Sequence, residues 1–312
     1  MAYKSQPKAT LTDSHAPVEK VGSNSTHLEV KRLRSKYAVL LAAAIVFLAA
    51  SARGQETNGP QGPEVATGSG AASDTNAANN PVNPQLTIDL QNYVTPSPEG
   101  YPGRFGDQGL FRVSVPMDLL GLHQFVRTIL PINTPVSTPG GPTAGVGDLT
   151  VYDLVLSKVH GITIGVGPLI AAPTARSEAY GSGKWQAGAA GIVLKPFNWG
   201  LLGVLINYQH SFSGNSSSPV GQVTTAQPIA HYNFHHGFYL RSTGVWTFNS
   251  FTHVQYIPLG FGAGKVWKRS NGDIVNFYIE PQYSVYHTGV ASPRWQIFAG
   301  ATFKFPLGND KK

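Results

Sequence analysis

The sequence predicts an all-β protein, an antiparallel transmembrane β-barrel of about 12 strands that follows a signal peptide and a disordered linker. Three observations lead to this prediction. From Gln85 onward, apolar side chains alternate with small or polar ones at the period of two that a strand requires. The alternating segments are about 9 to 14 residues long, which suits strands that cross a membrane at a tilt. Long and short connections also alternate for most of the chain, although the pattern weakens toward the end, where 249–253 and 268–273 are about equally brief.

Residues 1–52 are predicted to be an N-terminal extension and a signal peptide. Basic residues cluster at 31–36 and precede the apolar run 37–50, which is about 14 residues long and too short for a comfortable membrane span. Small residues at 50–52 stand at the spacing that a signal peptidase reads. The alternative is an uncleaved membrane anchor. A cleaved signal predicts export, with the cell outer membrane as the final location of a barrel.

Residues 53–84 are predicted to be a disordered linker. The segment is rich in Gly, Asn, Ala, Thr, Pro and Ser and contains almost no large apolar residue. Such a composition cannot bury enough apolar surface to offset the conformational entropy that is lost on ordering.

The predicted barrel occupies residues 85–306, and residues 307–312 form a polar C-terminal tail. The predicted strands span 85–94, 108–117, 123–133, 147–157, 161–171, 184–195, 200–211, 222–234, 237–248, 254–267, 274–286 and 295–305. Short connections are expected at 118–122, 158–160, 196–199 and 235–236. Longer ones, full of Gly, Pro, Ser and Thr, are expected at 95–107, 134–146, 173–183 and 212–221. Outer-membrane barrels alternate short periplasmic turns with longer outer loops in this way.

The last strand shows the alternation most clearly. Its lipid-facing side is predicted to comprise Trp295, Ile297, Ala299, Ala301, Phe303 and Phe305. Its inward side is predicted to include Gln296, Thr302 and Lys304. A soluble β-sandwich would give the same alternation. The signal peptide and the strand lengths favour the barrel, as do aromatic residues near strand ends, where a membrane girdle would lie: Tyr93, Phe125, Trp185, Trp199, Trp246, Trp267 and Trp295.

The formal charge of +7 is weak evidence for nucleic-acid binding, because most of it lies near the N-terminus. Residues 1–53 contain eight of the 23 Lys and Arg residues and three of the 16 Asp and Glu residues, so the remainder carries only about +2. We therefore expect no nucleic-acid partner. Cysteine is absent, which excludes disulfides and thiolate metal sites.

Several segments of the predicted barrel, in their order, resemble a known family. They are FRVSVPM, FVRTILPI, GVGDLTVYDLVLS, ITIGVGPLIAAPT, GSGKWQAGAAGIVL, AQPIAHYNFHHGFYLRSTGVWTFN, YIPLGFGAGKVWK and WQIFAGATFKFP. The chain from about Gln85 to Pro306 resembles bacterial neuromedin U-like or transporter outer-membrane proteins, which are related to the meta-pathway phenol-degradation family. The resemblance implies an outer-membrane barrel with a role in transport. It implies no residue-level mechanism.

Six charged residues are candidates for the lining of the lumen: Arg127, Asp148, Lys184, Arg241, Glu280 and Lys304. A charge that faces lipid at mid-depth costs roughly 2–4 kcal/mol, so the inner face or the rims are the cheaper positions. Two roles remain open for these residues. They pair across the lumen and support the barrel, or they set the electric field that a permeating solute meets.

No residue pattern predicts a catalytic, metal or cofactor site strongly. His231, His235 and His236 cluster at a predicted short turn, but adjacent residues of a strand point to opposite faces. Asn207, His210 and Ser211 raise the alternative of a barrel hydrolase, although no G-x-S-x-G element occurs. We expect no enzyme activity and no cofactor.

The sequence therefore predicts passive or facilitated passage of small solutes across the outer membrane, with hydrophobic or aromatic compounds among the candidates. The alternatives are a structural or adhesion barrel without transport and, as a weaker one, the hydrolase. The expected partners are outer-membrane lipid, an unidentified small solute and the barrel-assembly machinery.

Overall fold

The computed structural model describes residues 68–134 and 143–307. The predicted signal peptide, the first part of the predicted linker and nearly all of the polar tail lie outside the described residues. Among the described residues, no helix is both long enough and apolar enough to cross a membrane.

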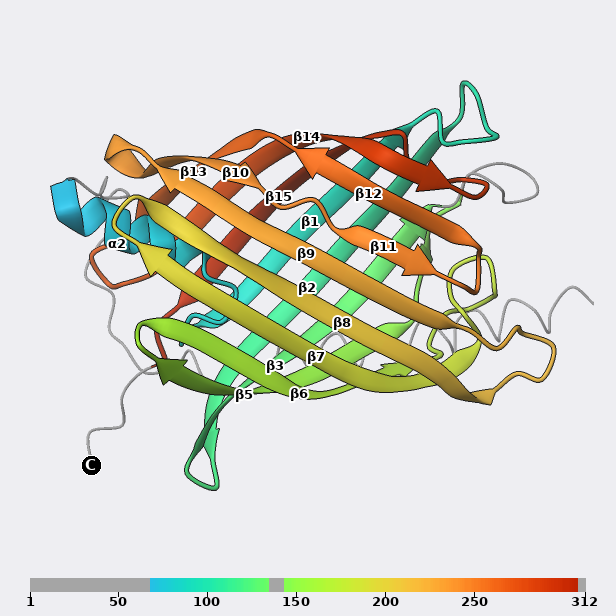
Figure 1. Ribbon diagram of the computed structural model, residues 1–312, viewed down its shortest axis with the longest axis horizontal. Helices are drawn as coiled ribbons and strands as arrows, with labels where there is room; N and C mark the ends of the chain where they lie inside the picture. Colours follow the sequence, from blue (N-terminus) through green and yellow to red (C-terminus); the bar gives the residue numbers. More distant parts are fainter. Residues whose placement is uncertain (1–67, 135–142, 308–312) are drawn as a thin grey trace, which may run out of the picture. The chain divides into compact units, whose positions relative to one another are not determined.

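The predicted fold class is confirmed, because the chain forms a closed, antiparallel β-barrel of 12 strands (Figure 1). Helix α2 (Gly68–Asn79) precedes the barrel, and the 3-10 turn η1 (His235–Gly237) lies within it. The first strands are β1 (Leu86–Pro96), β2 (Phe105–Leu119), β3 (Leu122–Thr134), β4 (Gly145–Val146), β5 (Leu149–Val159), β6 (Ile162–Ala172), β7 (Lys184–Phe197) and β8 (Gly200–Gly214). The others are β9 (Gln222–Asn233), β10 (Phe238–Ser242), β11 (Trp246–Asn249), β12 (Val254–Gly260), β13 (Gly262–Lys268), β14 (Ile274–Thr288) and β15 (Trp295–Phe305).

Two predicted strands are interrupted. The one expected at 237–248 is divided into β10 and β11, and the one expected at 254–267 is divided into β12 and β13. With each divided pair counted as one strand, the long strands pair in chain order, and β1 pairs with β15 to close the barrel. The register of β12 against β14 also shifts between Ile257 and Pro258, because proline has no N–H to donate to the ladder. Backbone pairing in the barrel wall is therefore incomplete around this stretch.

The short connections gather at one end of the barrel, as predicted (Figure 1). Two of these turns have positive φ at both central residues: Leu120 and Gly121, and His160 and Gly161. This is the type I′ turn, whose twist matches that of the strands it joins. β1 begins and β15 ends at this same end. By the usual arrangement of outer-membrane barrels, this end faces the periplasm and the longer loops face outward.

Side-chain exposure confirms which faces point inward and outward. In β15, Trp295, Ile297 and Phe305 are 55%, 39% and 37% exposed, whereas Gln296, Thr302 and Lys304 are buried. In β14, Phe277 and Ile279 are exposed, and Asn276, Glu280 and Gln282 are buried. The outer wall is thus apolar and the interior largely polar, which is the arrangement of a transmembrane barrel.

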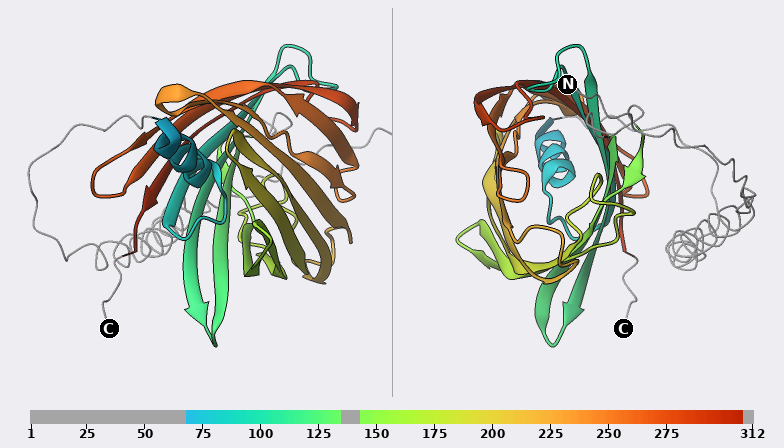
Figure 2. Two further views of the ribbon diagram at one scale, coloured as in Figure 1. Left: turned by 60° about the vertical axis from the view of Figure 1, so that its left-hand side comes forward. Right: turned by 90° about the vertical axis from the view of Figure 1, so that its right-hand side faces the viewer.

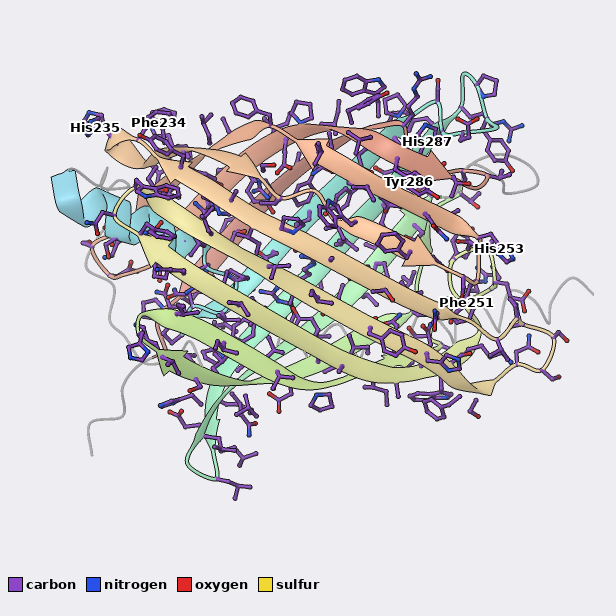
Figure 3. All side chains as sticks on the ribbon, in the orientation of Figure 1. Phe234, His235, Phe251, His253, Tyr286 and His287 are labelled. Carbon is purple, nitrogen blue, oxygen red and sulfur yellow. The ribbon has the colours of Figure 1, made fainter. Side chains whose placement is uncertain are left out.

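Aromatic side chains lie outside the barrel near both ends. Phe234 marks the short-turn end and Tyr286 the opposite end in Figure 3. At the short-turn end, Trp199 stacks against Phe197 with ring centroids 4.9 Å apart and contacts Tyr232 at 6.0 Å. At the other end, Tyr283 packs on Trp295 at 4.7 Å. These are the positions that aromatic girdles occupy at membrane interfaces.

Two of the predicted girdle residues, Tyr93 and Phe125, were assigned to the wrong face. Phe125 is fully buried inside the barrel, and Tyr93 stacks on the buried ring of Phe298 with centroids 4.3 Å apart. Both have the parity of the inward face, since Thr87 and Asp89 of β1 and Arg127 of β3 are also buried. A position near a strand end therefore does not show which face of the strand an aromatic side chain occupies.

The disorder predicted for residues 53–84 is wrong from Gly68 onward. Residues Gly68–Asn79 form α2, which lies within the ring of strands when the barrel is viewed along its length (Figure 2). The helix has no apolar stripe, so its own composition does not explain its order. The polar inner wall of the barrel supplies the missing partners, and Thr75, Ala78 and Val82 are buried against it.

A charge on the outer wall at mid-depth should destabilise the barrel. Ile279 is 55% exposed and pairs with Ala299 near the middle of β15. We expect Ile279→Arg to lower the free energy of unfolding by roughly 2–4 kcal/mol, because the guanidinium must leave water for lipid. Urea unfolding in lipid vesicles would measure this, with Ile279→Leu as the control. Equal stability of the two variants would mean that Ile279 does not face hydrocarbon.

Candidate functional site

The candidate site is the interior of the barrel, where three cavities meet. The largest, which we call the outer chamber, has a volume of about 650 Å³ and is lined in part by loop residues such as Tyr101 and Glu178. A side cavity of about 190 Å³ is lined by residues of β2, β3, β5, β6, β8 and β9. An inner cavity of about 80 Å³ is bounded by residues 78–81 of the N-terminal segment. Arg112 lines all three cavities.

Two arginine side chains inside the barrel are held by several contacts each. Arg127 Nε donates to Ser114 Oγ at 2.8 Å, its Nη1 donates to the Tyr152 hydroxyl, and its Nη2 donates to the Pro81 carbonyl at 2.7 Å. Arg241 Nε forms an ion pair with Glu280 Oε2 at 2.8 Å. Both side chains of this pair are almost fully buried, at 6% and 0% exposed.

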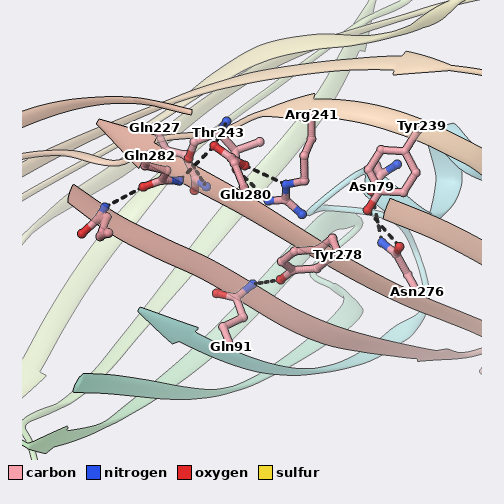
Figure 4. A network of polar contacts seen from close by, with 11 residues as sticks. Asn79, Gln91, Gln227, Tyr239, Arg241, Thr243, Asn276, Tyr278, Glu280 and Gln282 are labelled. Atoms are coloured by element: carbon pink, nitrogen blue, oxygen red, sulfur yellow. Dashed lines mark hydrogen bonds and ion pairs between the residues drawn. The ribbon is translucent and has the colours of Figure 1, made fainter. Parts of the chain in front are cut away.

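Glu280 is the centre of a polar network inside the wall (Figure 4). Its Oε2 also accepts from Thr243 Oγ1, and its Oε1 accepts from the backbone N–H of Thr243 at 2.8 Å and from Gln282 Nε2 at 2.9 Å. Thr243 lies between β10 and β11, where backbone pairing is interrupted. The carboxylate therefore satisfies an N–H group that the ladder leaves free, at a point where an unpaired buried donor would be costly.

Small residues make room for this network. A Cβ on Gly260 would lie 2.0 Å from Glu280 Oε1, so a larger residue would force the carboxylate out of its position in the network. A Cβ on Gly300 would lie 2.5 Å from the hydroxyl of Tyr278, whose ring stacks beneath the guanidinium of Arg241 at 3.7 Å. Gly at these positions permits a close approach of polar side chains from adjacent strands of the wall.

The N-terminal segment, residues 68–85, is held inside the barrel by side chains from both halves of the wall; we call it the plug. Lys304 Nζ donates to the carbonyls of Ala77 and Asn80 at 3.0 and 2.7 Å. Other wall contacts to the plug come from Arg127 to Pro81, Asn233 to Asn76, Asn276 to Asn79 and Lys268 to Asp74. Hydrogen bonds thus supply the order that the plug's own sequence does not provide.

The structure separates the six predicted lumen residues into groups. Arg241 and Glu280 form one ion pair, while Arg127 and Lys304 hold the plug. Asp148 and Lys184 lie elsewhere, at the base of the outer loops, where Asp148 Oδ2 accepts from the backbone N–H and hydroxyl of Ser182. Lys184 begins β7 and is buried.

Sequence reasoning missed Arg112 and the asparagines of the plug. Arg112 could have been found, because Phe111 and Val113 flank it in an alternating segment and place it on the inward face. Arg127 on the neighbouring strand was found by that reasoning. Asn76, Asn79 and Asn80 had no such signal, since they belong to a polar stretch without periodicity.

The residues considered for metal binding or hydrolysis do not converge. His231 is buried, whereas His235 and His236 of η1 are exposed. Figure 3 shows His235 at the short-turn end. Ser211 is buried on the inner face of β8, but its neighbour His210 is exposed on the outer face. Within residues 68–134 and 143–307, no group of three or more His, Asp or Glu side chains could hold a metal ion.

Comparison with solved structures finds outer-membrane proteins. An outer membrane channel from Pseudomonas putida F1 is 14% identical with a TM-score of 0.53, over 80% of this chain and 100% of that chain. The beta domain of the Bordetella autotransporter Brka is 12% identical with a TM-score of 0.37, over 71% of this chain and 100% of that one. A major outer membrane protein from Thermus thermophilus is 15% identical with a TM-score of 0.20, over 70% and 99%. The first similarity shows a shared fold. No protein-family model and no curated protein matches the sequence.

Proposed function

We propose that the protein is an outer-membrane channel that lets small solutes pass, with the plug restricting the periplasmic end. The observation that supports this most strongly is the outer chamber of about 650 Å³, which extends into the barrel as far as Arg112. A barrel with a purely structural role has no need of a hollow of this size beneath its loops. Ligand-binding clefts fall in the same range of volumes.

The chemistry of the interior also fits a passage for solutes that carry polar groups. Polar side chains such as Gln108, Asn133 and Gln296 line the outer chamber beside apolar ones such as Leu110 and Val254. Water and a polar solute can exchange hydrogen bonds with such a wall. The similarity in fold to the Pseudomonas putida F1 channel supports the proposal, because that protein is described as an outer membrane channel.

Solute flux into lipid vesicles tests the proposal directly. Vesicles that contain the purified full chain should admit a neutral solute such as glycerol faster than vesicles without protein. The matched control contains heat-unfolded protein from the same preparation, which removes the lumen and keeps the protein mass. Full-chain vesicles as impermeable as the control, together with no current in planar bilayers, would contradict the channel function.

A second candidate is a structural barrel without transport, and one observation favours it. The periplasmic half of the interior is filled, since Val82 of the plug packs against buried wall residues including Phe125, Tyr152 and Leu154. If the plug never moves, the outer chamber is open toward the outside and closed toward the periplasm. Flux across the membrane separates the two functions, because a chamber closed at one end can bind solutes but cannot release them on the other side.

We also propose that the protein is related to the neuromedin U-like outer-membrane proteins and that hydrophobic or aromatic compounds are among its solutes. The resemblance points to transport across the outer membrane. Partners that the proposal requires are outer-membrane lipid around the apolar wall and the barrel-assembly machinery during insertion.

A further inference from the structure

We infer that Arg112 is the recognition group of a binding site for a small organic monocarboxylate, whose aromatic or apolar body occupies the outer chamber. The inference rests on the proposed function and names the class of solute. It begins from a contrast between three inward arginines. Arg127 and Arg241 are held by side-chain hydrogen bonds and an ion pair, whereas the Arg112 side chain forms no hydrogen bond or ion pair with any other described residue.

The unpaired state of Arg112 is unusual for a group in its position. Its Nε is buried, and no described residue accepts a hydrogen bond from it. The side chain as a whole is half-buried and reaches the cavities, but an N–H group withdrawn from water needs an acceptor to offset its lost hydration. Its planar fork matches a carboxylate, which can accept two parallel hydrogen bonds from it. Arg112 therefore has the donor set of a carboxylate site without a carboxylate of the protein.

The nearest acid along the wall does not fill that role. Asp89 lies directly across the β1–β2 pair from Arg112, and both are inward-facing. Yet no ion pair joins the Asp89 and Arg112 side chains. Asp89 Oδ1 instead accepts from Thr302 Oγ1 at 2.6 Å, on the far side of β1 from Arg112. The guanidinium is left for a ligand that arrives through the cavities.

Arg112 can be reached by such a ligand, because it is the one residue that lines all three interior cavities in the described part of the chain. The outer chamber also supplies surfaces for an apolar body. Aromatic and aliphatic side chains line it, among them Tyr93, Tyr101, Leu110, Val254 and Tyr256. An aromatic ring packs favourably on such walls, while one polar group fixes its orientation.

The charges around the chamber argue for a single negative charge on the ligand. Two carboxylates line the outer chamber, Asp107 and Glu178. Each already accepts hydrogen bonds, Asp107 from Asn92 Nδ2 and Glu178 from Asn215 Nδ2 and Ser218 Oγ. Near these two carboxylates, a dianion such as phosphate would meet more repulsion than a monoanion with a neutral body.

Calorimetric titration of the purified full chain in detergent tests the site, with sodium benzoate as the probe. Benzamide is the matched neutral ligand, because it has the same ring and nearly the same size without the charge. We expect benzoate to bind and benzamide to bind at least tenfold more weakly. Equal binding of the two, absence of benzoate binding, or tighter binding of inorganic phosphate than of benzoate would overturn the inference.

Variants locate the binding at Arg112. Arg112→Gln should weaken benzoate at least tenfold, and Arg112→Lys should weaken it less, because lysine keeps the charge and loses the fork. Lys195→Gln is the control, since it removes a positive charge from an exposed position on the outer wall. Unchanged benzoate affinity in Arg112→Gln, or an equal loss in Lys195→Gln, would contradict the assignment. The comparison of benzoate with benzamide uses the unaltered protein and therefore tests carboxylate recognition even if a variant does not fold.

Failure of this site and failure of the channel are distinguishable. Binding of benzoate without vesicle flux would support the site and contradict the channel. Glycerol flux without benzoate binding would support the channel and contradict the site.

Discussion

Removal of the plug is expected to raise the current through the barrel several-fold. A variant that lacks residues 68–83 keeps all strands but loses α2 and the contacts from Lys304, Arg127 and Asn276. The inner cavity of about 80 Å³ is bounded by residues 78–81, so their loss opens the periplasmic end. Single-channel recording in planar bilayers would compare the variant with the full chain at equal salt and voltage.

A cross-linked variant provides the matched control. The chain contains no cysteine, so Asn79→Cys with Asn276→Cys introduces the sole thiols. These two side chains already share a hydrogen bond of 3.1 Å, which places them within reach of a short bis-thiol reagent. The joined protein should conduct less than the same protein before treatment, and each single-cysteine variant should be unaffected. Identical currents in the full chain and the deletion variant would show that the plug does not restrict the lumen.

The second large effect concerns the buried ion pair. Glu280→Ala should lower the free energy of unfolding by about 3–5 kcal/mol, because it leaves the Arg241 guanidinium buried without its partner. It also leaves the N–H of Thr243 unsatisfied where the wall lacks backbone pairing. The measurement is urea unfolding in vesicles, followed by the mobility shift of folded and unfolded barrel on gels.

Two control variants test whether the loss of stability comes from the unpaired buried charge. Asp118→Ala removes one partner of the exposed pair between Asp118 and His123 at a turn, and its stability should hardly change. Replacing both Arg241 and Glu280 by methionine should cost less than Glu280→Ala alone, because no unpaired charge remains. A Glu280→Ala barrel as stable as the Asp118→Ala barrel would show that the network does not support the wall.

The sequence predicted the barrel well because its strongest constraint is visible locally. A strand between lipid and a polar lumen must alternate at every step, and Phe277 and Ile279 against Asn276 and Glu280 show that alternation directly. The interruption near Thr243 was less visible. It depends on which neighbours Pro258 and Gly260 meet across the wall, which periodicity does not report.

The candidate site was only partly predictable for the same reason. Inward charges such as Arg127 and Glu280 follow from strand parity, but their partners lie many positions away in sequence. The plug was missed because its order comes from the wall. A segment with Asn76, Asn79 and Asn80 reads as disordered until a polar enclosure satisfies those amides.

The contacts of Lys304 have a consequence for the order in which the barrel folds. This residue belongs to the seam, where it pairs with Thr87, and its ammonium also binds Ala77, which is 227 positions earlier in the chain. Closure of so large a loop is entropically costly and therefore late, after the local hairpins have formed. Until β15 meets β1, one of the main anchors of α2 is missing. Docking of α2 and completion of the seam are thus coupled, and a barrel that has not yet closed should hold its N-terminal helix only loosely.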